Sequence, residues 1–239
     1  MRDLSHPVAV ITTCADVEWP FPQRASPYQD LSPFYTSFCG ATVSSFTSVT
    51  LGPPPIISFN LRVPSKTLSG ILRHKEFRVN IPRASETGAA IAHAFVTGKH
   101  EEGFETVAKF GHWVGLDNVQ SAQTRTSLEN SAPFIHGYGI HGVISCKAIP
   151  EKFIHVGDHV VVIAEVSSVS HSLHRPLEVS EDSRHFANAN LALSYAQQRY
   201  RDGSSKAIHV PDHPTHGSIR SLGKGSSSHS DITGRNPWV

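Results

Sequence analysis

Short apolar segments rich in β-branched residues recur along this chain and are separated by turns more often than by helices. Residue types of this kind favour the pleated, half-buried surface of a sheet. The segments span residues 8–13, 41–50, 56–61, 77–81, 141–148 and 159–169. Because few of them alternate with helices in the βαβ manner, the pattern favours a closed antiparallel barrel over a doubly wound parallel sheet.

Turn and helix signals complete this fold class. The segments 141–148 and 159–169 are joined through Val156-Gly157-Asp158, where Gly-Asp supplies turn chemistry, and they are predicted to form an antiparallel pair. Apolar residues at helical spacing predict helices over 67–74, 86–96 and 104–110, the last two on the surface. The prediction is a mainly β fold with peripheral helices.

The 239 residues suit one domain, predicted over residues 1–201, with a tail from 202 to 239. The tail is rich in serine, glycine, histidine and proline, and it offers little apolar surface to offset the entropy of ordering. We expect it to be disordered. A long loop over 15–38 carries too many prolines for a helix and too many aromatic residues for a simple linker, so it is expected to pack against the domain.

Composition argues against several classes of partner and location. The chain has 21 lysines and arginines against 20 acidic residues, so no basic face for nucleic acid is implied. We find neither a credible transmembrane span nor a signal peptide. Cys14, Cys39 and Cys146 are odd in number and widely spaced, which fits a reduced compartment. The expected location is cytoplasmic, or organellar if an N-terminal leader is missing.

Two apparent motifs are better explained without a ligand. Residues 137–142 match G-x-G-x-x-G, but a strand pattern follows where a nucleotide fingerprint needs a helix, so a glycine-rich loop entering a strand is predicted. Two groups of histidines have suggestive spacing, namely His155 with His159, and His209 with His213 and His216. The first pair flanks a turn and the second group lies in the predicted tail, so no metal site is expected.

A hydroxyl-rich segment is the most informative part of the sequence. It reads TVSSFTSV from residue 42, ISFNLR from residue 57 and PSKT from residue 64. Ser65, Thr67 and the N–H groups of a helix start can donate to a phosphate, while Arg62 or Lys66 neutralises its charge. The strand hydroxyls and amides can satisfy the polar edge of a flat heterocycle. Spacing alone favours the alternative of a hydroxyl-rich strand followed by an ordinary helix cap at Ser65.

The same segment resembles the flavin reductase-like family, which has an FMN-binding split barrel. Further blocks follow the family order: HPVAVITT from residue 6, FRVNI from residue 77, Cys146, and VGDHVVVIAEV from residue 156. The resemblance covers most of residues 6–200. It implies an antiparallel Greek-key split β-barrel, usually a homodimer, with FMN near the subunit interface. FAD is the alternative flavin, and NADH or NADPH is the electron donor.

The resemblance also implies roles for particular residues. The segment beside the isoalloxazine edge is matched by Thr42, Val43, Ser44 and Ser45. The adjoining strand is matched by Ser58, Phe59 and Asn60. The turn near the ribityl phosphate is matched by Ser65, Lys66 and Thr67, with Arg62 as a further cation. His159 matches the position where nicotinamide approaches the flavin, with a strand-end histidine bonded to backbone as the alternative.

The implied function is NAD(P)H-dependent flavin reduction, with hydride transfer from nicotinamide to flavin N5. Reduced flavin would then leave for a separate flavin-dependent monooxygenase or reduce another acceptor. Two alternatives stay open: an FMN-dependent oxidoreductase with its own organic substrate, and a non-catalytic flavin-binding protein. The loop over 15–38 is longer than in compact reductases, so it is a candidate lid or pocket wall.

Overall fold

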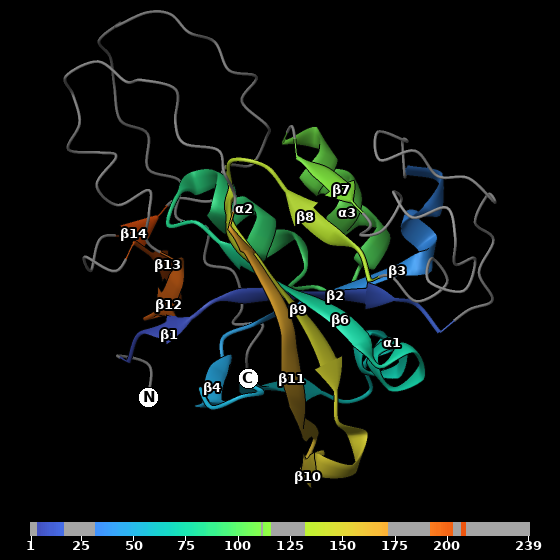
Figure 1. Cartoon of the computed structure of the whole chain (residues 1–239). Helices are drawn as coiled ribbons and strands as arrows, with labels where there is room; N and C mark the ends of the chain where they lie inside the picture. Colours follow the sequence, from blue (N-terminus) through green and yellow to red (C-terminus); the bar gives the residue numbers. More distant parts are fainter. Residues whose placement is uncertain are drawn as a thin grey trace, which may run out of the picture.

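The computed structural model describes residues 4–16, 32–110, 112–115, 132–171, 192–202 and 207–208. Its centre is an antiparallel sheet with the strand order β3-β2-β6-β9-β11-β5-β4, and β10 pairs with β11 (Figure 1). The strands are β2 (Ala9–Cys14), β3 (Phe38–Val43), β4 (Thr47–Thr50), β5 (Ile56–Arg62), β6 (Glu76–Pro82), β9 (Ile140–Ala148), β10 (Ile154–Val156) and β11 (His159–His171).

The sheet curls into a half-barrel, as its connections require. β3 and β4 follow each other in the chain, yet they lie at opposite ends of the strand order. The sheet therefore has to bend until β3 lies beside β5, which it contacts without a ladder of backbone hydrogen bonds. We call this line of contact between β3 and β5 the seam. The mainly β, antiparallel split-barrel fold predicted from the sequence is confirmed.

One predicted strand is divided in two. Residues 41–50 were expected to be continuous, but β3 pairs with β2 whereas β4 pairs with β5. The chain leaves one ladder and joins another over residues 44–46. Ser45 lies between the two ladders, and its Oγ accepts a hydrogen bond of 2.8 Å from the Asn60 N–H across the seam.

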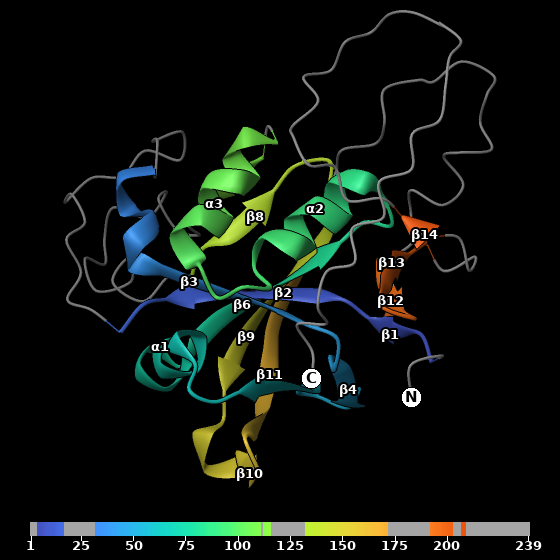
Figure 2. The ribbon, with the colours of Figure 1, turned by 180° about the vertical axis from the view of Figure 1, so that it is seen from behind.

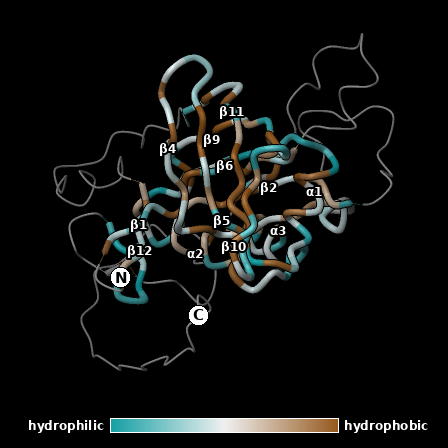
Figure 3. The backbone as a smooth tube through the Cα atoms, turned by 90° about the horizontal axis from the view of Figure 1, so that it is seen from below, coloured by the Kyte–Doolittle hydropathy of each residue, from teal (hydrophilic) through white to brown (hydrophobic). Residues whose placement is uncertain are grey.

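The interior of the half-barrel is filled by alternate residues of its strands. On β5, Ile57, Phe59 and Leu61 are buried, while the residues between them face outward. Alternation of this kind follows from the two-residue period of a strand. The neighbouring strand β11 contributes Val160 and Val162 to the same cluster. Hydrophobic residues are accordingly concentrated along the central strands in Figure 3.

The helices lie on two sides of the sheet. α2 (Glu86–Ala94), α3 (His100–Lys109) and the pair β7 (Trp113–Gly115) and β8 (Phe134–His136) lie on one side of β2 and β6, and α1 (Lys66–His74) lies on the other (Figures 1 and 2). Two short 3-10 helices, η1 (Ser32–Ser37) and η2 (Pro150–Lys152), complete the helical part.

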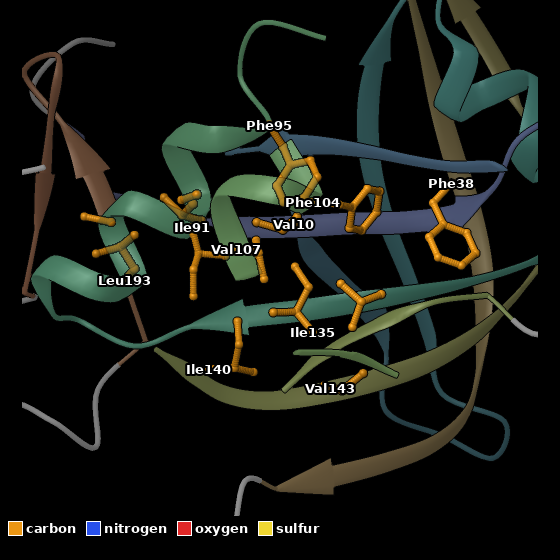
Figure 4. Close-up of a cluster of buried hydrophobic side chains, with 14 of the residues drawn as sticks. Val10, Phe38, Ile91, Phe95, Phe104, Val107, Ile135, Ile140, Val143 and Leu193 are labelled. Atoms are coloured by element: carbon orange, nitrogen blue, oxygen red, sulfur yellow. The ribbon is translucent and has the colours of Figure 1, made fainter. Parts of the chain in front are cut away.

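The prediction that α2 and α3 lie on the surface is wrong for α2. Ala89, Ala90, Ile91 and Ala92 are at most 3% exposed, because their small side chains let the helix approach the sheet closely. They belong to a second apolar cluster that includes Phe95 and Phe104 and is drawn in Figure 4. The two phenylalanine rings meet edge to face with centroids 4.9 Å apart.

Helix α1 confirms the helix predicted over 67–74. Ser65 is its N-cap, and the Ser65 Oγ accepts a 3.1 Å hydrogen bond from the Leu68 N–H. The helix packs on the backbone of β2 at Gly70, where an added Cβ would lie 2.1 Å from the Cys14 carbonyl oxygen. Glycine at this position therefore fixes the distance between the helix and the strand.

The glycine-rich residues 137–142 form a turn that enters β9, as predicted, and no helix follows them. Gly137 has a φ of +144°, and a Cβ there would meet the His112 ring at 2.3 Å. The His112 Nδ1 donates to the Phe110 carbonyl at 3.0 Å, and its Nε2 accepts from the Gly139 N–H at 2.8 Å. Neutral His112 thus anchors the turn to the end of α3.

Acid should weaken the fold through His112. Burial lowers the pKa of His112 below its usual 6.5, so the unfolded chain binds the proton more readily than the folded chain does. The stabilisation is complete above about pH 6.5 and is lost as the pH falls from there towards the lowered pKa. We expect urea unfolding midpoints to decrease between pH 7.5 and pH 5.5, and to decrease less in His112→Gln than in a control, His93→Gln, on the exposed face of α2. Equal pH dependence in both variants would contradict this account.

A small second sheet joins the two ends of the described chain, with the order β1-β12-β13-β14. Its strands are β1 (His6–Pro7), β12 (Ser194–Ala196), β13 (Arg199–Arg201) and β14 (Ala207–Ile208). β14 falls within the predicted tail, and residues 203–206 and 209–239 lie outside the described residues, as do residues 17–31 of the long loop. Within the described ranges, the helices are too short and too polar to cross a membrane.

Candidate flavin site

Polar groups gather on the outer side of the seam. Ser58 and Asn60 face outward on β5, because their neighbours Ile57, Phe59 and Leu61 fill the interior. Ser45 joins them from the other side of the seam. Its Oγ accepts the hydrogen bond from Asn60, so its own hydroxyl proton can be donated to a ligand. This part of the seam therefore offers neutral donors and acceptors of the kind that bind the polar edge of a heterocycle.

The start of α1 forms the second part of the site. The Ser65 hydroxyl uses an acceptor lone pair for the helix cap and keeps its proton, and the first N–H groups of a helix have no intrahelical partner. Thr67 is fully buried, and its Oγ1 has no hydrogen-bond partner among the described residues. Lys66 is exposed and adds a positive charge. Together these groups suit an anion such as a phosphate.

The two parts lie at opposite ends of β3. Ser45 meets Asn60 just beyond one end of the strand, and Cys39 lines a cavity together with Lys66 at the other end. Asn60, which contacts Ser45, is five positions from Ser65 in the chain, so the two parts lie at most about 17 Å apart. One extended cofactor could therefore span the heterocycle-binding groups and the anion-binding groups.

His159 belongs to an exposed network at the outer end of β5. Arg62 lies opposite His159 in the β5–β11 ladder. The Asp158 carboxylate joins the two side chains, because its Oδ2 accepts from the Arg62 Nε at 3.0 Å and its Oδ1 accepts from the His159 Nδ1 at 2.7 Å. The hydrogen bond from His159, followed by charge interactions with His159 and Arg62, lowers the pKa of Asp158.

This network adds to two interpretations of the sequence. Arg62, predicted as a further cation near the phosphate turn, pairs with Asp158. Asp158, predicted as a turn residue, also joins Arg62 to His159. In the sequence, only its position before His159 in Gly-Asp-His indicated this role of Asp158. The pairing of β5 with β11, which brings Arg62 opposite His159, could not be predicted from residue spacing.

Four of the predicted flavin contacts have buried side chains, and Thr67 at the helix start is one of them. Val43 and Phe59 lie in the interior cluster at 3% and 0% exposure. Thr42 is also buried, and its hydroxyl donates to the Ala92 carbonyl at the end of α2. These three residues can reach a ligand on the seam only through their backbone. Ser44 is partly exposed and stays within reach of the seam.

His100 is a site neighbour that the sequence analysis missed. It begins α3, and its Nδ1 lies 2.8 Å from the Gly40 carbonyl on the free edge of β3. Burial, with a smaller contribution from nearby Lys66, lowers the pKa of His100. The ring therefore stays neutral at physiological pH and ties the start of α3 to the strand that carries the seam.

The histidines considered for a metal do not form a described cluster. Among the described residues, no group of three or more histidine, cysteine or acidic side chains is arranged to hold a metal ion. His155 lies on β10, opposite Val160. His209, His213 and His216 lie outside the described residues.

Comparison with known proteins adds an independent line of evidence. The family model described as "Flavin reductase like domain" matches residues 1–204. Among solved structures, nitrilotriacetate monooxygenase component B from Mycobacterium thermoresistibile is 17% identical, with a TM-score of 0.55 over 88% of both chains. A putative flavin reductase from Haemophilus somnus 129pt is 16% identical, with a TM-score of 0.53 over 84% of this chain and 93% of that one.

A third structure has a similar fold. BorF, the flavin reductase component of a bacterial two-component tryptophan halogenase, is 17% identical and has a TM-score of 0.52. The match covers 84% of this chain and 91% of that chain. At these identities the likeness shows the fold alone.

Proposed function

The chain belongs to the family of flavin reductase-like domains, whose members are oxidoreductases, and on that premise we propose that it reduces a flavin with NADH or NADPH. The flavin is FMN or its dinucleotide form, held along the seam. One observation supports the proposal: the polar groups around the Ser45–Asn60 contact and the capped start of α1 with Lys66 lie near the two ends of β3.

The chain's own residues fit such a cofactor. Ser45, Ser58 and Asn60 would bind the polar edge of the ring system, and Ser65, Lys66 and Thr67 would bind its phosphate. The Thr67 side chain is fully buried, so Thr67 would contribute its backbone N–H rather than its hydroxyl. When bound, the flavin supplies the hydride acceptor, and the protein contributes alignment and electrostatic stabilisation.

His159 would orient the nicotinamide beside Arg62, at the end of β5 that leads into α1. Its Nδ1 is occupied by Asp158, which leaves Nε2 for a ligand. Asp158 in turn is fixed by Arg62 and by the backbone, since its carbonyl accepts from the Val63 N–H at 2.8 Å. Asp158 is thus a positioning residue that holds the imidazole in one orientation.

We predict that Asp158→Asn slows hydride transfer on the order of tenfold, since small errors in the alignment of reactants are costly. Flavin affinity should change less than the rate, because Asp158 contacts the segment before the helix start through its backbone carbonyl, which the substitution keeps. Stopped-flow reduction and a flavin titration would measure the two quantities. Glu151→Gln, at an exposed position in η2, is the matched control. A variant that reduces flavin at the wild-type rate would remove Asp158 from this role.

The outer face of β10 and β11 supports a homodimer as part of the proposal. Ile154 and Val156 are exposed by 56% and 58%, and the ladder places Val161 opposite Ile154. Exposed apolar groups that form one surface are typical of an interface. A flavin-dependent monooxygenase as recipient of the reduced flavin, and a cytoplasmic location, also stay predictions. The first is in keeping with the names of the structures similar in fold.

Steady-state oxidation of NADH and NADPH, with and without added flavin, tests the proposed function. We expect oxidation of at least one nicotinamide cofactor that requires flavin and saturates with it. Flavin binding without oxidation of either nicotinamide would instead indicate a binding protein.

A further inference from the structure

A second cavity lies between β8 and the paired strands β9 and β11. Its volume is about 370 Å³, which is within the range of sites for small molecules. Residues 168–171 at the end of β11 contribute to its wall. Ser168 follows His159 by nine positions in β11, which corresponds to about 30 Å in an extended strand. The cavity is therefore separate from the place where His159 would orient the nicotinamide.

Three hydroxyl groups line one wall of this cavity. They belong to Ser145, Ser168 and Ser170. In the β9–β11 ladder, Ser168 lies opposite Ser145, and Ser170 lies opposite Val143. Directly opposite residues of an antiparallel pair point to the same face of the sheet, so the three hydroxyls share one face. Each of them can donate a hydrogen bond to a ligand.

Groups that carry or can carry positive charge surround the hydroxyls. His136 and His171 line the cavity, whereas no aspartate or glutamate occurs among the described residues of its wall. Arg78 lies opposite Ser145 in the β6–β9 ladder and so starts from the same face of the sheet. His141 meets His171 edge to face with ring centroids 6.2 Å apart. Imidazole, guanidinium and hydroxyl donors without facing carboxylates favour an anion.

The rest of the wall is apolar. It includes Phe134, Ile135 and Val143, and the last two belong to the cluster drawn in Figure 4. The Ile135 N–H donates to the Asn80 Oδ1 at 2.8 Å, which fixes β8 over β6 and so holds this wall in place. A ligand that fits both walls combines an anionic end with an apolar body. A small inorganic anion would leave the apolar wall uncovered.

We propose that the cavity between β8 and residues 168–171 binds a small organic carboxylate with an apolar body. The carboxylate would accept hydrogen bonds from the serine hydroxyls and from His171, and the body would pack on Phe134 and Val143. This inference does not depend on the proposed function, because neither flavin nor nicotinamide takes part in it.

A titration of the full chain with benzoate, followed by protein NMR, tests the class of ligand. Benzamide is the control, because it has nearly the same shape and carries no charge. We expect saturable binding of benzoate, and binding of benzamide that is weaker by about tenfold or more. Equal affinities would overturn the assignment of an anion, and absence of saturable benzoate binding would overturn the whole inference.

A steric variant tests the location. Ser168→Trp places bulk in the cavity, whereas Val169→Trp places the same bulk on the opposite face of β11, where Val169 is 55% exposed. Ser168→Trp should abolish benzoate binding, and Val169→Trp should leave it unchanged. Wild-type affinity in a folded Ser168→Trp variant would contradict the location.

A milder variant tests the imidazole and keeps the inference testable if Ser168→Trp does not fold. His171→Gln should weaken benzoate binding by about fivefold or more and leave benzamide binding unchanged, because a hydrogen bond to a charged group is lost. The control is His155→Gln, at an exposed position on β10. Equal benzoate affinity in the two variants would contradict the role of His171.

Competition with FMN separates this cavity from the proposed flavin site. Saturating FMN should leave the affinity for benzoate unchanged. Displacement of benzoate by FMN would place benzoate in the flavin site and overturn the inference.

Discussion

Replacing Phe59 with alanine should lower the free energy of unfolding by about 3 to 5 kcal/mol, the usual cost of removing a buried aromatic side chain. Phe59 is fully buried at the centre of the half-barrel. Its ring meets Phe77 edge to face with centroids 5.4 Å apart, so the variant loses both buried area and an aromatic contact. Urea unfolding with an unchanged m value would measure the loss.

The neighbouring residue provides the control for Phe59. Ser58 points to the other face of β5 and is partly exposed, so Ser58→Ala should change the stability by no more than about 0.5 kcal/mol. Flavin affinity should be weakened more by Ser58→Ala than by Phe59→Ala, because Ser58 lines the seam and Phe59 does not. A loss below about 1 kcal/mol in Phe59→Ala would contradict the placement of its side chain in the core.

Removing the anion-binding groups at the start of α1 should have the largest effect on cofactor affinity. Hydrogen bonds to a charged group contribute about 1.5 to 3 kcal/mol each. The double variant Ser65→Ala/Lys66→Ala removes two such groups, so we expect the flavin Kd to rise by about 100-fold or more. The affinity for riboflavin, which has no phosphate, should change little. A titration with FMN, FAD and riboflavin would measure all three.

Loss of the helix cap complicates this variant and requires a matched control. Ser65→Ala removes the N-cap of α1, at a cost of about 1 kcal/mol in stability. Ser85 caps α2 in the same way, since its Oγ accepts from the Gly88 N–H at 3.1 Å. The control Ser85→Ala/Lys109→Ala should therefore lose similar stability and keep its flavin affinity. Equal losses of affinity in both double variants would refute the phosphate assignment.

Much of the fold could be predicted because the local signals agree with it. The helix from residue 66 follows from the capping chemistry of Ser65, and the strand at residues 56–61 follows from its β-branched composition. The alternation along β5 also predicts that Phe59 points inward, because Ile57 and Leu61 share its face. The family pattern places Phe59 at the flavin site, whereas the alternation of the strand places its side chain in the core.

Other features depend on contacts between distant segments. The Thr42 hydroxyl donates to the carbonyl of Ala92, which lies fifty residues away in the sequence. The residues next to Thr42 in the sequence therefore do not indicate that its side chain is buried. The division of 41–50 into two strands follows from the curl of the whole sheet, and both pieces contain threonine and valine, which favour strands. Asp158 acquires its partner Arg62 only when β5 and β11 are paired.

Anaerobic mixing of the flavin-loaded protein with NADH or NADPH tests the central claim most directly. We predict that the visible absorbance of the oxidised flavin disappears with at least one of the two donors, at a rate that Asp158→Asn reduces. A protein that binds flavin and keeps it oxidised with both donors would contradict the account.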